Sequence, residues 1–365
     1  MIKLRNLLLV LCVLHFQIAG EVKLAWALPQ GEQVAAGGAQ FDRPNEVTLN
    51  VTTSDKAIID YSQFNIDLPE TVNFFQPSSS SIVLNRVTGG DPSSILGRLN
   101  ANGKVFLVNP NGILFGPGSV INAAGFVASV LDIANEDFMN GHYAFNLKPG
   151  SENAAVVNQG LIQVAEGGYA GLLAPQVSNQ GVVIANRGKV VLASGEKATV
   201  DFNGDGLMKF TVSGDLEQAL IHHSGSIEAQ GGQVLLTVGA AQAVLQNVIN
   251  QEGIIRAGSM IEDGGTIRLV SAGGGIVSNS GTLDVASQNG KGGTVQVLGD
   301  KVGLFDGEVN ASGAAGGGTV LIGGDRQGLN ADIRNASRTY MSETAMIQAD
   351  ALENGNGGKV IVFGN

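Results

Sequence analysis

The sequence predicts an all-β protein that folds as a parallel β-helix, and three observations support this prediction. The chain of 365 residues contains 53 glycines and nine prolines, with 44% hydrophobic and 15% charged residues. Short stretches in which aliphatic and polar residues alternate recur along the chain, as in strands with one buried face. No segment with helical periodicity separates these stretches, which argues against repeating strand–helix–strand units.

Two glycine-led units recur from residue 160 onward. In the first, a large aliphatic residue follows the glycine by two positions and a small or aliphatic residue follows it by four, as in Gly160, Ile162 and Val164. This unit occupies residues 160–164, 181–185, 225–229, 253–257, 281–285 and 307–311. A second unit of the same form occupies residues 188–192, 232–236, 265–269, 293–297, 318–322 and 358–362. Each coil of a β-helix gives one strand to each of several sheets, and stacking between coils buries the apolar face.

The residues between the units indicate corners. Asn158, Asn179 and Asn279 precede the first unit by two residues, and asparagine side chains satisfy the backbone of turns. We expect the glycines to supply positive φ angles at these corners. From Gly181 onward, the second unit begins 7, 7, 12, 12 and 11 residues after the first, so the corner between them lengthens. A β-sandwich is the alternative fold, but it needs hairpin turns such as Asn-Gly at strand-to-strand spacing, and such turns are few.

The first 27 residues are predicted to be an export signal. Lys3 and Arg5 give a positive start, an apolar stretch covers residues 7–16, and Ala-Trp-Ala at residues 25–27 is a cleavage site. Leu28 would then begin the mature chain. The apolar stretch is too short to span a bilayer, which needs about 20 residues, and no other stretch is long enough.

The charge of the mature chain excludes some classes of binding partner. Removal of residues 1–27 leaves 18 basic and 31 acidic residues, so the net charge changes from −11 to −13. This charge argues against nucleic acid or anionic lipid as a partner. The single cysteine, Cys12, leaves with the signal, so the mature chain has no disulfide.

The sequence divides at about residue 150. Residues 151–365 consist of the glycine-rich repeats, whereas residues 28–150 are less regular, although the repeat unit matches residues 103–107, 118–122 and 125–129. The chain ends at Asn365 directly after a repeat unit, so we expect either a short protein or a truncated reading frame.

Two local features are expected within the first segment. Residues 28–60 are predicted to cap the first coil, because the open end of a β-helix is an unpaired sheet edge. Residues 132–139 are predicted to form one short helical turn, which Gly141 ends.

Several stretches between residues 28 and 147 point to a known family. They are Leu-Pro-Gln-Gly at residues 28–31, Ser-Gln-Phe-Asn at 62–65, Val-Asn-Phe-Phe-Gln-Pro at 72–77, Ile-Val-Leu-Asn-Arg-Val at 82–87, Ile-Leu-Gly at 95–97 and Asn-Pro-Asn-Gly-Ile at 109–113. Together they resemble the N-terminal secretion domain of the filamentous haemagglutinin family, the exported partner in two-partner secretion. The chain departs from the pattern at residues 64–67, which read Phe-Asn-Ile-Asp where many members have Asn-Pro-Asn-Leu.

The resemblance implies a right-handed parallel β-helix with an N-terminal cap. It also implies export across the inner membrane into the periplasm and transfer through a dedicated outer-membrane β-barrel transporter. The periplasmic part of that transporter is expected to recognise residues 28–150. The protein would then be secreted or displayed on the surface of a Gram-negative-type bacterium.

Asn109, Pro110, Asn111, Gly112 and Ile113 are the predicted secretion motif. Asparagine at the first position, proline at the second and glycine at the fourth match a type I turn. This turn either orders one corner of the coil, so that secretion depends on it indirectly, or completes the surface that faces the transporter. Asn85 and Arg86 are further candidates, either as buried polar anchors or as transporter contacts.

Other candidate sites are rejected, and no metal, cofactor or catalytic residue is predicted. Residues 201–206 begin like a calcium-binding loop but lack the glutamate at its twelfth position and the flanking helices, and they suit the tip of a hairpin. The adjacent His222 and His223 point to opposite faces of a strand, so we expect a surface role and no shared metal. Ser194 and Lys197 match the bare Ser-x-x-Lys pattern of serine acyl enzymes without its companion motifs.

These observations favour a secreted structural protein, an adhesin in particular, over an enzyme. Its expected receptor is a glycan or protein on a host cell or other surface. One alternative is a polysaccharide-degrading enzyme, but the outward-pointing Glu228, Arg268 and Asp284 are expected to lie singly. The other is the secretion portion of a longer toxin, cytolysin or contact-dependent inhibitor.

Overall fold

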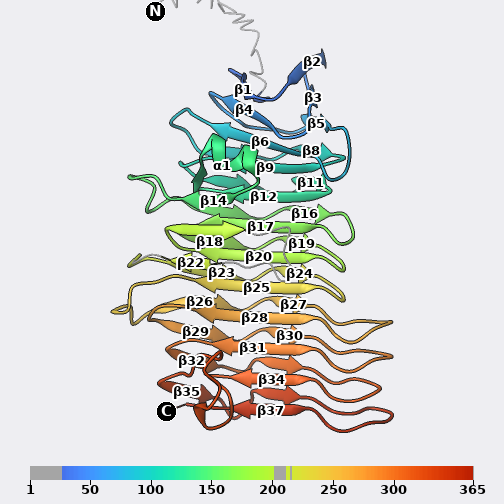
Figure 1. Cartoon of the computed structure of the whole chain (residues 1–365), viewed down its shortest axis with the longest axis vertical. Helices are drawn as coiled ribbons and strands as arrows, with labels where there is room; N and C mark the ends of the chain where they lie inside the picture. Colours follow the sequence, from blue (N-terminus) through green and yellow to red (C-terminus); the bar gives the residue numbers. More distant parts are fainter. Residues whose placement is uncertain (1–26, 201–210, 214–215, 365) are drawn as a thin grey trace, which may run out of the picture.

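The structure is a computed structural model that describes residues 27–200, 211–213 and 216–364. The described chain forms one stack of coils with three long sheets (Figure 1). Two sheets of twelve strands run from end to end, and a third sheet of nine strands begins at residue 93. The predicted parallel β-helix is therefore confirmed. The predicted export signal lies outside the described residues, except for Ala27.

The three sheets are named here by number. Sheet 1 contains β1 (Gln33–Ala36), β4 (Ala57–Tyr61), β6 (Ile82–Val87), β9 (Lys104–Val108), β12 (Gly125–Ser129), β17 (Tyr169–Ala174), β20 (Lys189–Ser194), β25 (Gln233–Val238), β28 (Thr266–Ser271), β31 (Thr294–Leu298), β34 (Thr319–Ile322) and β37 (Lys359–Val362). Sheet 2 contains β2 (Ala39–Asn45), β3 (Thr48–Thr53), β5 (Thr71–Phe75), β8 (Arg98–Ala101), β11 (Val120–Ala123), β16 (Leu161–Val164), β19 (Val182–Ile184), β24 (Ser226–Glu228), β27 (Ile254–Arg256), β30 (Thr282–Asp284), β33 (Glu308–Asn310) and β36 (Met346–Gln348). Sheet 3 contains β7 (Ser93–Ile95), β10 (Ile113–Phe115), β15 (Ala155–Asn158), β18 (Gln176–Asn179), β23 (Leu220–His223), β26 (Asn247–Gln251), β29 (Ile276–Asn279), β32 (Lys301–Leu304) and β35 (Arg338–Met341).

The two repeat units of the sequence correspond to two of these sheets. Strands of the first unit all lie in sheet 2, and strands of the second all lie in sheet 1. Their inward side chains stack in register from coil to coil, as Ile227, Ile255 and Leu283 do, each fully buried. The core of the protein is therefore a set of aliphatic columns parallel to the axis of the stack.

Positive φ angles occur at corner glycines such as Gly167 and Gly231, as expected, but not at the glycines that lead the units from Gly160 onward. They are required by a close approach of backbones instead. A Cβ atom on Gly225 would lie 2.1 Å from the carbonyl oxygen of Gly181, and one on Gly265 would lie 2.1 Å from that of Gly232. Each coil therefore rests on the glycine of the coil before it.

The N-terminal cap is smaller than residues 28–60. Within the three long sheets of the described chain, only β1 with β4 and β2 with β3 pair antiparallel. β3 and β4 already run parallel to β5 and β6, so they belong to the first coil. The cap therefore consists of β1, β2 and the residues just before them.

A second, smaller structure covers sheet 1 beside the stack. The helix α1 (Asn135–Asn140) ends at Gly141, whose φ of 77° is left-handed, as the sequence predicts. The predicted start at residue 132 was wrong, because β13 (Asp132–Ile133) is a strand. It forms an antiparallel side sheet with β14 (Tyr143–Asn146), β21 (Lys197–Val200) and β22 (Thr211–Ser213). A short 3-10 turn, η1 (Arg326–Gly328), follows β34.

The side structure seals the outer face of sheet 1 with aromatic rings. The ring of Phe106 points outward from β9 and lies 5.9 Å from that of Phe138 and 5.5 Å from that of Tyr143, in edge-to-face contacts. Figure 1 places α1 and β14 over these N-terminal coils. Among the residues that the structure describes, no helix is long and apolar enough to cross a membrane.

Candidate functional site

The Asn-Pro-Asn-Gly-Ile stretch forms the corner that leads from β9 in sheet 1 to β10 in sheet 3. The Gly112 N–H donates to the carbonyl oxygen of Asn109 at 3.1 Å, which closes the predicted four-residue turn. The Asn111 N–H donates to the side-chain oxygen of Asn109 at 3.0 Å. Gly112 has a φ of 116°, a value that disfavours any other residue.

Asn109 links three successive coils through this corner. Its side chain is fully buried, and its Nδ2 donates to the carbonyl oxygen of Asp91 and to the Oγ of Ser93, both at 3.0 Å, in the preceding coil. Its backbone N–H donates to the carbonyl oxygen of Ser129 in the following coil at 2.9 Å. Buried polar atoms with several partners hold their surroundings in one arrangement, so Asn109 fixes the corner from inside.

Asn111 is the exposed part of the corner. Its Nδ2 donates to the carbonyl oxygen of Gly89 at 2.9 Å, which ties the turn to the preceding coil. Pro110 beside it is half-exposed, whereas Gly112 and Ile113 are buried. A partner that binds this corner would therefore meet Pro110 and Asn111.

Asn85 lies inside the stack on β6. Its side chain is fully buried, and its Nδ2 donates to the carbonyl oxygen of Phe106 at 3.3 Å. Its Oδ1 has no hydrogen-bond partner among the described residues. The burial of Asn85 fits the anchor interpretation.

Arg86 points the other way, from sheet 1 into the side structure, and is 8% exposed. Its Nε donates to Asp132 at 2.8 Å, its Nη1 to Asn135 at 2.8 Å and to Asp60 at 3.2 Å, and its Nη2 to the carbonyl oxygen of Ile133 at 2.5 Å. One guanidinium thereby joins the first coils to β13 and the start of α1. Its geometry fits the anchor interpretation.

The carboxylate of Asp132 carries the charge that faces Arg86. Burial raises the pKa of this carboxyl group, but a hydrogen bond from Lys148 and the charge of Arg86 outweigh that effect and hold the pKa below its usual value. Asp132 is therefore ionised at neutral pH, and the Arg86 cluster is a charged network.

A row of polar side chains runs through the core on sheet 3. Asn158, Asn179, His223, Gln251 and Asn279 occupy one register position, and all are fully buried. The Nδ2 of Asn158 donates to the Oδ1 of Asn179 at 2.8 Å, and the Nδ2 of Asn179 lies 3.0 Å from the Nδ1 of His223. The expected surface role of His223 was therefore wrong: strand alternation places it inside and leaves its neighbour half-exposed.

The buried histidine makes stability depend on pH. Burial lowers the pKa of His223 from 6.5 to about 4, so between these values the unfolded chain binds a proton that the folded chain does not. The free energy of unfolding is expected to fall by about 1.4 kcal/mol per pH unit as the pH drops from 6.5 towards 4, and then to level off. The variant His223→Asn carries the same residue type that already occupies position 179 of this row. It should remove the part of the pH dependence that comes from the histidine. Denaturant unfolding of both proteins across this range tests it, and parallel curves would contradict it.

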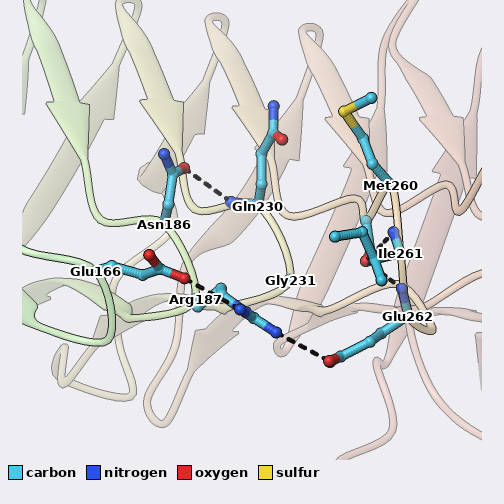
Figure 2. Close-up of a pocket in the computed structure, with 9 residues that line it drawn as sticks. Glu166, Asn186, Arg187, Gln230, Gly231, Met260, Ile261 and Glu262 are labelled. Atoms are coloured by element: carbon cyan, nitrogen blue, oxygen red, sulfur yellow. Dashed lines mark hydrogen bonds and ion pairs between the residues drawn. The ribbon is translucent and has the colours of Figure 1, made fainter.

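A groove of about 290 Å³ opens where corners join sheet 2 to sheet 1 (Figure 2). Arg187 crosses its floor and pairs with Glu166 at 3.1 Å and with Glu262 at 2.9 Å. Met260 and Ile261 stand on the longer corner, 58% and 77% exposed. This groove was not predicted, although the 12-residue spacing after Gly253 indicates a long corner at this position.

A pair of aromatic rings lies on the outer face of sheet 3. The rings of Phe305 and Tyr340 are 5.2 Å apart and tilted by 32°, and these side chains are 41% and 55% exposed. Gly303 permits the arrangement, because a Cβ there would lie 2.2 Å from the Phe305 ring. Lys301 and Arg338 line the same hollow of about 610 Å³. Phe305 and Tyr340 are 35 positions apart in the sequence, and their contact was not predicted.

The three charged residues considered for an enzyme were expected to lie singly, and the structure differs from this expectation. Glu228 and Asp284 do not lie singly, because they occupy one row of sheet 2 on either side of Arg256. Arg256 pairs with Glu228 at 2.7 Å. Arg268 lies on β28 in sheet 1, away from this row.

The remaining rejected candidates show no arrangement typical of a site in the part of the chain that the structure describes. Ser194 is fully buried, and its Oγ donates to the carbonyl oxygen of Pro175 at 2.6 Å. Residues 201–206 lie outside the described residues, although β21 and β22 on either side pair antiparallel as a hairpin. Within the described ranges, no group of three or more His, Cys, Asp or Glu side chains is placed to hold a metal.

Comparisons with known proteins agree with this architecture. The family model of the TPS secretion domain matches residues 26–285. A heme/hemopexin-binding protein of Haemophilus influenzae is 35% identical over 225 residues, which are 60% of this chain and 24% of that protein. A second protein of that name from Haemophilus influenzae is 26% identical over 66% of this chain and 28% of its own. The chain thus spans about a quarter of the length of these relatives. The crystal structure of the HMW1 secretion domain from Haemophilus influenzae matches with a TM-score of 0.81 and 34% identity, covering 88% of this chain and 84% of that one.

Proposed function

Because this chain belongs to the TPS secretion domain family, we propose that its corner at residues 109–113 carries recognition by an outer-membrane transporter. The chain is an exoprotein of a two-partner secretion system, which crosses the periplasm and is secreted to the cell surface of a Gram-negative bacterium. The proposal concerns which of its residues meet the transporter and what the protein does outside.

The proposal is supported by the different positions of two asparagines in this corner. Asn109 is buried and bonded to two neighbouring coils, so it fixes the conformation of the corner. Asn111 lies on the exposed surface of the same corner. A preformed corner binds without an ordering cost, which favours a polar contact at Asn111. Asn85 and Arg86 act behind this surface, because they hold the coils and the side structure together.

Asn111→Ala is expected to weaken binding to the isolated periplasmic part of the cognate transporter about tenfold, with a change in unfolding free energy below about 1 kcal/mol. Asn109→Ala removes buried hydrogen bonds and should reduce both binding and stability, by about 1–3 kcal/mol for stability. The measurement is calorimetric titration of each secreted variant alongside its denaturation curve. Asn354→Ala, in an exposed corner near the other end, is the matched control. Wild-type binding by Asn111→Ala would overturn the contact role.

We further propose that the secreted protein acts as an adhesin and not as an enzyme. The carboxylate of Glu228 is held by Arg256 at 2.7 Å within the row of sheet 2 and is thus already engaged by a side chain of the protein. The aromatic pair Phe305–Tyr340 suits attachment, because exposed rings side by side offer a flat apolar face to a sugar ring. Arg338, at the edge of the hollow, supplies a cation for a carboxylate.

The attachment proposal predicts selective binding of a glycan that carries carboxylates. The secreted chain should bind a hyaluronan tetrasaccharide more tightly than neutral chitotetraose, and Tyr340→Ala should weaken that binding at least tenfold. Phe75→Ala removes another exposed ring, on sheet 2, and should leave binding unchanged. Equal binding of both sugars, or no effect of Tyr340→Ala, in a titration by fluorescence would contradict the proposal.

A further inference from the structure

Glu70 is a buried carboxylate at the N-terminal end of the stack, just before β5. It is fully buried, and no ion pair to it exists among the described residues. Its Oε1 accepts hydrogen bonds from the backbone N–H groups of Ala27 at 2.6 Å and Leu28 at 3.2 Å. Its Oε2 accepts one from the N–H of Asp67 at 2.6 Å. The carboxylate therefore holds the start of the described chain.

Hydrogen bonds from backbone amides reduce the free-energy cost of burying the Glu70 carboxylate, but they do not cancel its negative charge. Charged side chains are rarely buried without an opposite charge. The cation of the neighbouring strand β2, Arg43, is already engaged with Glu32 at 2.7 Å and with the carbonyl oxygen of Pro29 at 2.8 Å. Arg98 reaches Glu70 only through its backbone N–H, and its side chain is exposed.

The other charged groups at this end of the stack are mostly acidic. Arg43 and Glu46 line a hollow at this end, Glu32 pairs with Arg43, and Asp67 lies on the turn that leads to Glu70. Glu46 and Asp67 are acidic and increase the negative potential around the Glu70 carboxylate. A positive charge at the backbone nitrogen of Leu28 would lie 3.2 Å from Oε1.

We propose that cleavage after Ala27 creates this cation and completes the cap, so that the α-ammonium group of Leu28 pairs with Glu70. The inference rests on the cleavage site predicted from the sequence and is independent of the transporter site. Water adds across the Ala27–Leu28 peptide bond: the carboxylate of Ala27 leaves with the signal, and the new α-amine of Leu28 takes up a proton. The side chain of Leu28 is 5% exposed in the apolar core, so the new terminus is already seated.

The pairing couples processing to folding of the N-terminal coils. Before cleavage, the nitrogen of Leu28 is a neutral amide and Glu70 keeps an uncompensated charge. After cleavage, the ion pair closes the cap over Leu49 and Val72, which are fully buried in the first coils. Cleavage removes the hydrogen bond from the Ala27 N–H, and the charged amine of Leu28 replaces it with a charge-assisted contact to the same carboxylate.

The test compares the secreted chain that begins at Leu28 with the same chain acetylated at its α-amine. The α-amino group has an ordinary pKa of about 7.7–8.0, and pairing with Glu70 raises it in the folded state. The stabilisation is then fully present below pH 7.7 and is lost as the pH rises through the raised value. At pH 6.5 the free amine should lower the unfolding equilibrium constant at least tenfold relative to the acetylated chain, and the two should converge at high pH.

Glu70→Gln should make unfolding insensitive to acetylation. If that variant does not fold, the comparison of free and acetylated wild-type chains still decides the question. Equal unfolding curves for those two chains at pH 6.5 would overturn the proposal. N-terminal sequencing of the secreted protein should give Leu-Pro-Gln-Gly, and a different start would overturn it as well.

Discussion

Gly265→Ala is expected to cost about 3 kcal/mol of unfolding free energy, although it adds a single methyl group. That methyl group would lie 2.1 Å from the carbonyl oxygen of Gly232 and 2.7 Å from that of Ala257. One obstacle is a backbone atom of the preceding coil and the other a backbone atom of the same corner, so neither moves aside as a side chain would. Overpacking of this kind typically costs about 1–3 kcal/mol. Coils on both sides of Gly265 should separate, because each is stabilised by its neighbours.

The matched control for this substitution is Gly90→Ala. A Cβ on Gly90 meets no atom within 4 Å, and its φ is not in the left-handed region. The midpoint of denaturant unfolding should therefore change little for Gly90→Ala and fall clearly for Gly265→Ala. Similar midpoints for the two variants would show that close stacking of the coils is not what requires glycine.

Arg86→Met is expected to cost about 3–5 kcal/mol and to release the side structure from the first coils. The substitution keeps the aliphatic stem but removes the guanidinium from Asp60 and leaves Lys148 as the remaining cation at Asp132. Breaking a buried ion pair by removing one partner carries this cost because the other charge stays desolvated. Asn135 and the carbonyl oxygen of Ile133 lose their donors as well.

Arg187→Met provides the comparison for Arg86→Met. Arg187 also contacts two acidic residues, but its side chain is 53% exposed and those of Glu166 and Glu262 are 66% exposed. Solvent screens such pairs, so the expected loss is below about 1 kcal/mol. The measurement is the unfolding free energy of each variant, with hydrogen exchange at β13 and α1 as the local readout. Losses of equal size would mean that burial does not set the strength of the Arg86 network.

Two of the three sheets could be predicted from the sequence, because their strands combine a leading glycine with strict alternation. Sheet 3 gave no comparable signal, since its inward positions include a polar row from Asn158 to Asn279 that interrupts the apolar pattern. His223 was misplaced for the same reason: a polar residue in a strand is expected to point outward, whereas here it bonds to Asn179 in the preceding coil. The side sheet was also missed, because β14 pairs with β21, more than 50 residues away.

Within the candidate site, the corner could be predicted and its surroundings could not. The spacing of Asn109, Pro110 and Gly112 encodes a turn that the backbone confirms. The burial of Asn109 and the exposure of Asn111 depend on Gly89 and Asp91, which belong to another coil. The assignment of these residues to secretion, like the division at residue 150, stays a prediction.

The most direct test of the account is secretion from a Gram-negative host, with and without the cognate outer-membrane transporter, for wild type and Asn111→Ala. The account predicts wild-type protein in the medium only when the transporter is present, and about tenfold less for Asn111→Ala with unchanged stability. Wild type that stays in the periplasm despite a working transporter, or Asn111→Ala that is secreted as well as wild type, would contradict it.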